Sequence, residues 1–286
     1  MRAVVFKGDL VIEDRPIPPV PEGHLLVKVE RSVVGPLERG LKRGLVWVEP
    51  GRVVGMEGYG RVEETGANTN IKKGEIVSSP ILVNESDIVG VHVDGFLAEY
   101  AIVPESAVEP LPEGRPEHLA LAGTGALASW LKEKLEGYRA LLIGGGLTNV
   151  LTSFLSNWEI PILSWGHEIS APVQLFPTIA SACTQEWDTV VVSVLDAMAV
   201  DTATMCVKEG GTIILHPLVA YSKHVFAGKQ VKVEVMQRNE LREGYEAISK
   251  LPSQLLRELV EFSDSLDKAL DSKASRSILK PPVSGT

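Results

Sequence analysis

The sequence predicts a two-part α/β protein in which an all-β region precedes a doubly wound parallel sheet. Before residue 117, short β-branched runs alternate with turns rich in glycine and proline, and helical patterns are scarce. After residue 117, apolar strands alternate with helices, which is the order typical of a parallel sheet with right-handed crossovers. The run TVVVSV at 189–194 is apolar throughout, as a strand covered on both faces requires.

The expected elements follow from these patterns in chain order. In the first region we expect five strands, in the runs AVVF, HLLVKVE, RVVGMEGYGRVEE, EIVSSPILV and FLAEYAIV. In the second region we expect a helix over 117–136, followed by strand 140–143, helix 147–157, strand 160–164, a short strand near 173–176, strand 189–194, helix 196–208 and strands 212–215 and 230–235. A helix around 252–261 and a short strand in SRSILKPPV complete the chain.

Composition limits the class of protein and its partners. The 286 residues are 44% hydrophobic and 23% charged, which is typical of a globular protein with a substantial core. No targeting peptide or membrane-spanning run is visible, so we expect a cytoplasmic protein with no membrane partner. The net charge of −9 argues against nucleic acid as a partner. Two cysteines, Cys183 and Cys206, are too few for a zinc cluster or a disulfide framework, and we expect both to be buried, reduced thiols.

The domain order resembles that of the medium-chain dehydrogenase/reductase superfamily, the group of alcohol dehydrogenases and quinone reductases. The resemblance is carried by VVGMEGYGRVEETG (53–66), IKKGEIV (71–77), DGFLAEYAIVPES (94–106), KEGGTIIL (208–215) and SDSLDKALDSKASRSILKP (263–281). It implies a GroES-like β-barrel domain formed by residues 1–122 and 253–286. It also implies a Rossmann domain over 123–252, with an active site in the cleft between the two domains.

The positions that would bind a catalytic zinc carry no suitable side chains. The resemblance places Gly35 where zinc members have a cysteine and Met56 where they have a histidine. The third ligand would fall near LALAGTG, which contains no Cys, His, Asp or Glu, and residues 72–95 contain no cysteine for a structural zinc lobe. Because a catalytic zinc needs three protein ligands, the sequence predicts a protein without zinc or any other metal.

A glycine turn after strand 140–143 has the outline of a dinucleotide loop. Gly144 and Gly146 stand where the fingerprint needs a tight turn and a close approach of the backbone to the pyrophosphate, with Gly145 between them. Thr148 follows in the first turn of the expected helix and could bind the same phosphates. The third glycine is replaced by Asn149, which we expect to push the helix outward. A plain strand-to-helix turn is the alternative interpretation.

The choice of cofactor depends on charge. Ser164 occupies the place of the acid that would bind the adenosine ribose, and Glu168 is the nearest substitute. Residues 140–207 contain six acids and no lysine or arginine, so a 2′-phosphate would find no charge-assisted partner there. The sequence therefore favours NAD(H) over NADP(H), and it leaves open a protein that binds no cofactor.

Two hydroxyl side chains are candidates for the reacting end of the site. The resemblance places Thr124 near the nicotinamide, and a helix residue packed beside two glycines is its alternative role. Tyr59 could donate a proton to a carbonyl oxygen, although a strand tyrosine usually belongs to the core or its rim. Glu57 aligns with a family glutamate behind the active site, and its alternative role is a buried acid paired with an arginine such as Arg61.

The leading interpretation is a zinc-independent oxidoreductase that moves a hydride between a nicotinamide cofactor and a small carbonyl or activated alkene. The alternative is a non-catalytic relative that keeps the fold as a binding or assembly protein. The small-molecule substrate cannot be named from the sequence. A homodimer is open, because the run QVKVEVMQ (230–237) could pair edge to edge with a second copy, although Lys232 and Glu234 disfavour this pairing.

Overall fold

The computed structural model describes residues 1–165 and 170–281, and these form two compact units. The first unit contains residues 1–126, 239–250 and the segment from 259 onward, and the second contains residues 127–238 and 251–258. The expected α/β class, with a β domain and a Rossmann-type parallel sheet, is confirmed. The expected domain boundaries at 122/123 and 252/253 stay a prediction. No helix in the described part of the chain is long and apolar enough to cross a membrane.

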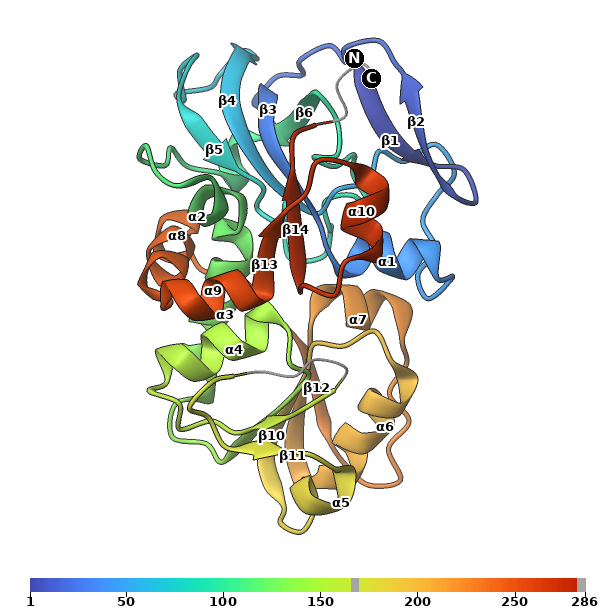
Figure 1. Ribbon diagram of the computed structural model, residues 1–286, viewed down its shortest axis with the longest axis vertical. Coiled ribbons are helices and arrows are strands. Elements are labelled where there is room, and N and C mark those ends of the chain that lie inside the picture. The colour runs from blue at the N-terminus through green and yellow to red at the C-terminus, as the bar shows by residue number, and fades with distance from the viewer. Residues whose placement is uncertain (166–169, 282–286) are drawn as a thin grey trace. The chain divides into compact units, whose positions relative to one another are not determined.

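The first unit is built on a mostly antiparallel sheet with the order β13-β14-β3-β4-β5, in which β6 also pairs with β3. Figure 1 shows the red strand β14 beside the blue strand β3, two segments that are far apart in the sequence. The strands are β3 (His24–Val34), β4 (Glu57–Thr65), β5 (Ile76–Ser78), β6 (Tyr100–Pro104), β13 (Val260–Phe262) and β14 (Arg276–Leu279), with a separate hairpin of β1 (Arg2–Phe6) and β2 (Leu10–Asp14).

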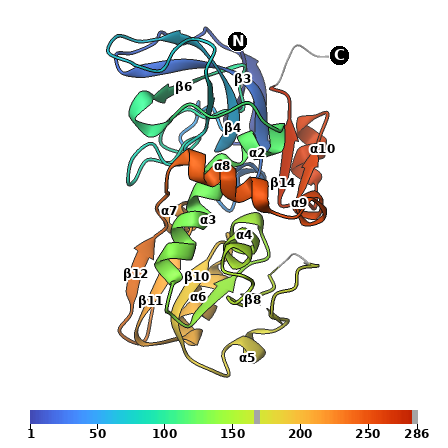
Figure 2. The ribbon, with the colours of Figure 1, turned by 90° about the vertical axis from the view of Figure 1, so that its left-hand side faces the viewer.

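Short helices surround this sheet. They are α1 (Pro36–Lys42), a 3₁₀ turn (Glu105–Ala107), α2 (Pro116–Ala120), α8 (Leu241–Lys250) and α10 (Leu266–Asp271), together with the start of α3 (Ala122–Leu135). The single helix expected over 117–136 is therefore interrupted at Leu121. Helix α8, which lies beside α2 in Figure 2, was not expected, although its Leu241, Ala247 and Ile248 are buried at helical spacing.

The second unit is a six-stranded parallel sheet with the order β12-β11-β10-β7-β8-β9. The chain starts at the central strand β7, winds to one edge, and then returns to build the other half from β10, so the order reverses between β7 and β10. Val190 of β10 pairs with Leu141 on one side and Ile213 on the other, and all three are buried. The strands are β7 (Ala140–Ile143), β8 (Ile162–Leu163), β9 (Leu175–Phe176), β10 (Trp187–Val192), β11 (Val207–Leu215) and β12 (Lys232–Val235).

The helices of the second unit are α4 (Leu147–Leu155), α5 (Ile179–Ala182), α6 (Ala197–Cys206), α7 (Pro217–Ser222) and α9 (Ser253–Leu259). The expectation of two reduced thiols was wrong, because Cys183 and Cys206 form a disulfide. Each cysteine lies at the end of a helix, α5 or α6, and their Cα atoms are 4.6 Å apart, within the range that a disulfide spans. Counting cysteines in the sequence could not reveal this proximity.

Candidate functional site

A buried polar cluster lies at the centre of the first unit. The guanidinium of Arg276 donates from Nε to Oε2 of Glu57, and each of these side chains is 3% exposed. The hydroxyl of Thr124, which is fully buried, donates to the other carboxylate oxygen of Glu57 at 2.5 Å. Arg276 Nη2 reaches the same hydroxyl at 3.4 Å. The buried carboxylate, guanidinium and hydroxyl therefore form hydrogen bonds with one another.

Strand register brings this cluster together. In the ladder between β3 and β14, Ser277 pairs with Val34, which sets Arg276 opposite the next residue, Gly35. In the ladder between β3 and β4, Val33 pairs with Glu57. A Cβ atom placed on Gly35 would lie 3.1 Å from Cδ and 3.2 Å from Nε of Arg276. The arginine side chain therefore lies directly against the position where residue 35 would project a side chain.

Helix α1 contributes two further buried charged groups. Glu38 is 1% exposed and accepts the Gly35 backbone N–H at 2.8 Å, while its Oε1 has no hydrogen-bond partner among the described residues. Burial raises the pKa of Glu38, and the charge of Glu57 adds to this shift. Arg39 donates to the carbonyl of Ala269 and to the hydroxyl of Ser277, and burial lowers its pKa. These contacts tie α1 to the C-terminal segment.

The alternative role of Glu57, a buried acid paired with an arginine, is confirmed, but its partner is Arg276 and not Arg61. Arg61 binds Glu30 at 2.9 Å and Glu113 at 2.8 Å. Glu57 and Arg61 lie on the same face of β4, but four residues of a strand span about 13 Å, which is too far for an ion pair. The partner, Arg276, was missed, although an arginine in the expected short strand SRSIL signals a paired charge, because arginine is rarely buried alone.

The two predicted catalytic hydroxyls both lie in the first unit. Tyr59 is 4% exposed in β4, two residues from Glu57 and on the same face of the strand. Burial raises the pKa of the Tyr59 phenol, and the neighbouring charge of Glu30 acts in the same direction. Thr124 already donates its proton to Glu57. The role of either side chain in a reaction stays a prediction.

The predicted glycine turn lies in the second unit, where β7 ends and α4 begins. Gly144 has φ +115°, a conformation that favours glycine, and its N–H donates to Leu163. A Cβ atom on Gly144 would lie 2.3 Å from Cγ2 of Val194. Gly146 is the N-cap of α4 and supplies no capping side chain, Gly145 is buried, and Thr148 is the second residue of the helix. Gly144 therefore makes a tight turn between β7 and α4 that only glycine fits, and cofactor binding by this turn stays a prediction.

The side chain of Asn149 does not form hydrogen bonds with the backbone N–H groups of the glycine turn. The side chain is fully buried, and its amide donates to the carbonyl oxygens of Ile143 and Gly144, both at 3.0 Å. Its Oδ1 accepts the Ser193 hydroxyl at 2.8 Å. Asn149 ties α4 to the ends of two strands, and the expectation that it pushes the helix outward stays a prediction. These hydrogen bonds use carbonyls and a hydroxyl, so Asn149 accepts none of the N–H groups of the turn.

The region that would bind the adenosine ribose is only partly described. Ser164 follows β8 directly, and its N–H donates to Phe176. Glu168 lies outside the described residues. Asp196 caps helix α6 by accepting the N–H of Met198 and also accepts the indole N–H of Trp165 at 3.0 Å. One of the six acids in residues 140–207 therefore has a structural role.

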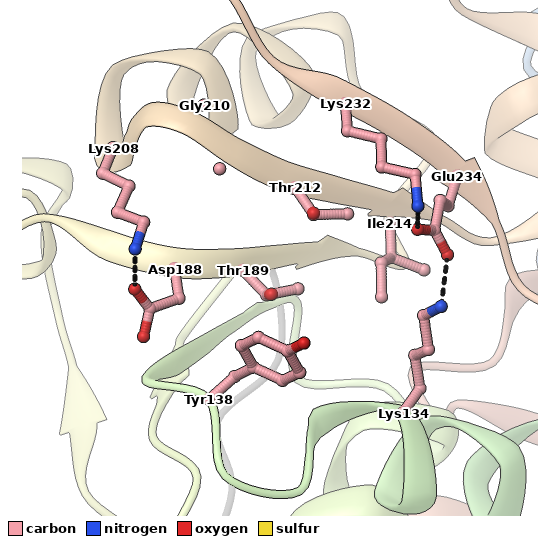
Figure 3. Close-up of a pocket in the computed structure, with 11 residues that line it drawn as sticks. Lys134, Tyr138, Asp188, Thr189, Lys208, Gly210, Thr212, Ile214, Lys232 and Glu234 are labelled. Carbon is pink, nitrogen blue, oxygen red and sulfur yellow. Dashed lines mark ion pairs between the residues drawn. The ribbon is translucent and has the colours of Figure 1, made fainter.

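A second candidate site is a pocket of about 330 Å³ in the second unit, which lies over β10, β11 and β12 and is shown in Figure 3. Its ion pairs join Lys208 to Asp188 at 2.5 Å, and both Lys134 and Lys232 to Glu234 at 2.9 and 2.5 Å. Within this pocket two carboxylates offset three ammonium groups, which leaves a single excess positive charge. None of the predicted site residues lines it.

The residues aligned with zinc ligands do not form a metal site. Gly35 has no side chain, Met56 is buried and offers only a thioether, and Glu57 already pairs with Arg276. In the described part of the chain, no three His, Cys, Asp or Glu side chains lie close enough together to bind a metal ion. The donor set therefore does not fit a catalytic zinc.

Comparison with known proteins supports the fold and the family. Residues 21–113 match the family model of the alcohol dehydrogenase GroES-like domain. The chain is 29% identical over 130 residues to an L-threonine 3-dehydrogenase from Xanthomonas axonopodis pv. citri, and 31% identical over 126 residues to one from Bacillus licheniformis. These stretches span only 38% and 36% of the relatives' own lengths, and 38% and 37% of this chain. The match at residues 21–113 supports the resemblance of this chain to the medium-chain dehydrogenase/reductase superfamily.

Solved structures of this superfamily share the fold over nearly the whole chain. Acetophenone reductase from Geotrichum candidum, determined in complex with NAD, matches with a TM-score of 0.74 and 18% identity, over 98% of this chain and 96% of its own. A thermostable alcohol dehydrogenase from Pyrobaculum aerophilum matches with a TM-score of 0.73 and 19% identity, over 98% and 99%. At sequence identities of 18% and 19%, these comparisons show that the fold is shared.

Proposed function

We propose that this protein is a zinc-independent oxidoreductase of the medium-chain type, which transfers a hydride between a nicotinamide cofactor and a small carbonyl or activated alkene. The observation that carries the proposal is the way Asn149 is accommodated. Its hydrogen bonds go to Ile143, Gly144 and Ser193, so the amides of the glycine turn are not used by the residue that replaces the third glycine. The N-cap of helix α4 is Gly146, which has no side chain to cap the helix. A helix start of this kind suits the binding of an anion, because the positive end of the helix dipole attracts negative charge.

The proposed cofactor is NAD(H) in preference to NADP(H). Residues 140–207 supply no lysine or arginine for a 2′-phosphate. Ser164, at the end of β8, would offer a hydroxyl to the ribose, and Glu168 is proposed as the acid that binds the ribose diol. The backbone of Gly144–Gly146 and the hydroxyl of Thr148 would bind the pyrophosphate.

The chain's own residues would orient and polarise the substrate, while the bound nicotinamide supplies or accepts the hydride. Tyr59 is proposed as the proton donor, because a tyrosine phenol is protonated at neutral pH and can donate a hydrogen bond to a carbonyl oxygen. Thr124 has a different task, because its hydroxyl already donates a hydrogen bond to Glu57 and accepts one from Arg276, which leaves one lone pair for another partner. We therefore propose that Thr124 accepts a hydrogen bond from the reacting molecule.

Thermal unfolding with each nucleotide tests cofactor binding. NADH at about 100 times its Kd should stabilise the folded protein by about 2.7 kcal/mol, and NADPH should stabilise it less. The protein should be treated with EDTA beforehand, and a shift that survives this treatment supports a site that works without metal. AMP serves as a control that has the adenosine but lacks the pyrophosphate bridge.

The second candidate function is a non-catalytic relative that retains the fold for binding or assembly. Ser164 in place of the usual acid, in a stretch of the sheet domain that lacks basic residues, favours this interpretation. Absence of a thermal shift with either nucleotide at millimolar concentration would support this candidate and refute the enzyme. Sedimentation at micromolar concentration would show whether the edge strand β12 supports the proposed homodimer.

A further inference from the structure

The pocket of Figure 3 begins at the amino ends of three parallel strands. There, Thr189 of β10 pairs with Thr212 of β11, and Thr212 pairs with Lys232 of β12. The glycine turn instead follows the carboxyl end of β7 at Ile143. Because the strands are parallel, their amino and carboxyl ends lie at opposite edges of the sheet. A ligand in the pocket would therefore lie apart from the proposed cofactor turn.

The excess positive charge of this pocket lies at one end, on the right in Figure 3. The two carboxylate oxygens of Glu234 bind Nζ of Lys134 at 2.9 Å and Nζ of Lys232 at 2.5 Å, so two ammonium groups share one carboxylate. An ammonium group has three N–H donors, so each lysine can also donate to a ligand. At the other end, Lys208 and Asp188 form a pair without net charge. A negatively charged group therefore fits best beside Glu234, between the two lysines.

Hydroxyl groups line the pocket between its two charged ends. Figure 3 shows Tyr138, Thr189 and Thr212 between the two groups of ion pairs, with the apolar side chain of Ile214 beside them. Thr189 is only 5% exposed, so the sheet fixes its position. A hydroxyl both donates and accepts hydrogen bonds, and the carboxylate of Asp188 accepts them. This lining matches a ligand whose own groups donate and accept, as the hydroxyls of a polyol do.

We propose that this pocket binds a polyhydroxylated monocarboxylate, a small sugar acid, with its carboxylate between Lys134 and Lys232 and its hydroxyl groups over the two threonines. One negative charge on the ligand balances the single excess positive charge, whereas a phosphate monoester, with a charge of about −2, would leave one charge uncompensated. The volume of about 330 Å³ lies within the range of small-molecule sites. The inference goes beyond the proposed function and does not depend on a nicotinamide cofactor.

Isothermal titration of gluconate into nucleotide-free, full-length protein at low ionic strength tests this proposal. Gluconate should bind saturably, and at least about tenfold more tightly than glucose, which lacks the carboxylate, or propionate, which lacks the hydroxyls. Lys232→Met removes the excess charge and should weaken gluconate binding at least about tenfold. Lys268→Met is the matched control, because Lys268 and Lys232 are 70% and 66% exposed and Lys268 forms its ion pair with Asp264, outside the pocket. Its affinity for gluconate should equal that of the wild type.

A second variant, Thr212→Val, removes a hydroxyl from the pocket without changing its charge. It should weaken gluconate binding by about threefold or more. The inference is overturned by an absence of saturable gluconate binding at millimolar concentration, by equally tight binding of glucose or propionate, or by unchanged gluconate affinity in a folded Lys232→Met or Thr212→Val protein. Far-ultraviolet circular dichroism establishes that each variant is folded. Because the titration contains no nucleotide, a failure of the protein to bind NADH leaves its result intact.

Discussion

Arg276 and Glu57 are 219 residues apart in the sequence, yet they form an ion pair in which each side chain is only 3% exposed. Strand β14 brings the arginine to β3, and β3 pairs with β4, which carries the glutamate. The C-terminal segment is therefore needed to complete the interior of the first unit. Loss of either partner would leave a buried charge without compensation.

Arg276→Met should destabilise the protein by about 3–5 kcal/mol, because Glu57 remains buried and unpaired. The double variant Glu57→Gln/Arg276→Met removes both charges and should recover a large part of that loss. Urea unfolding monitored by tryptophan fluorescence gives both values. Equal stability of the single and the double variant would show that the charge of Glu57 does not depend on Arg276.

Asn149→Ala should destabilise the protein by about 1–3 kcal/mol, because the buried carbonyl oxygen of Gly144 loses its side-chain donor. NADH binding should survive, since Asn149 takes no N–H group from the turn. Ser193→Ala is the matched control, because it removes only the donor to Asn149 Oδ1. A folded Asn149→Ala protein that no longer binds NADH would contradict the assigned role of this side chain.

The stability of the protein should depend on the protonation of Glu38. Its pKa is raised from the ordinary value of 4.5, mainly by burial, so its contribution to folding is complete below pH 4.5 and is lost as the pH rises through its value in the folded protein. The variant Glu38→Gln cannot titrate. Its stability relative to wild type should therefore increase as the pH rises from 4.5 through the raised pKa of Glu38.

Urea unfolding across this pH range measures the effect. The exposed Glu136→Gln is a matched control for loss of one negative charge, and its difference from wild type should stay flat. A difference for Glu38→Gln that is equally flat would show that Glu38 does not titrate in this range.

Local patterns in the sequence predicted much of the fold. Strand 140–143 was predicted with the bounds of β7, and the expected helices at 147 and 196 begin within one residue of α4 and α6. These elements have strong signals, namely an apolar run ending in glycines and an aspartate that can cap the start of a helix. Helix α8 also has a readable stripe, so its omission reflects a missed pattern.

The contacts inside the site could not be predicted in the same way. Arg276 and Glu57 meet through two strand ladders, and Cys183 and Cys206 meet because two helices end side by side. Such proximities depend on tertiary register, which a one-residue shift would change. The substitution of Asn149 for glycine was visible in the sequence, but the direction of its hydrogen bonds depends on strand β10, which delivers Ser193.

The most direct test of the central claim is an isothermal titration of NADH into EDTA-treated wild-type protein and into Gly146→Val. Gly146 has φ −76°, so valine fits the backbone, while its side chain would obstruct the approach of a pyrophosphate to the start of α4. We predict saturable binding of about one NADH per chain to the wild type and a loss of at least about tenfold in affinity for the variant. Absence of binding to the wild type, or unchanged affinity in a folded Gly146→Val protein, would contradict the claim that this turn binds the cofactor without a metal.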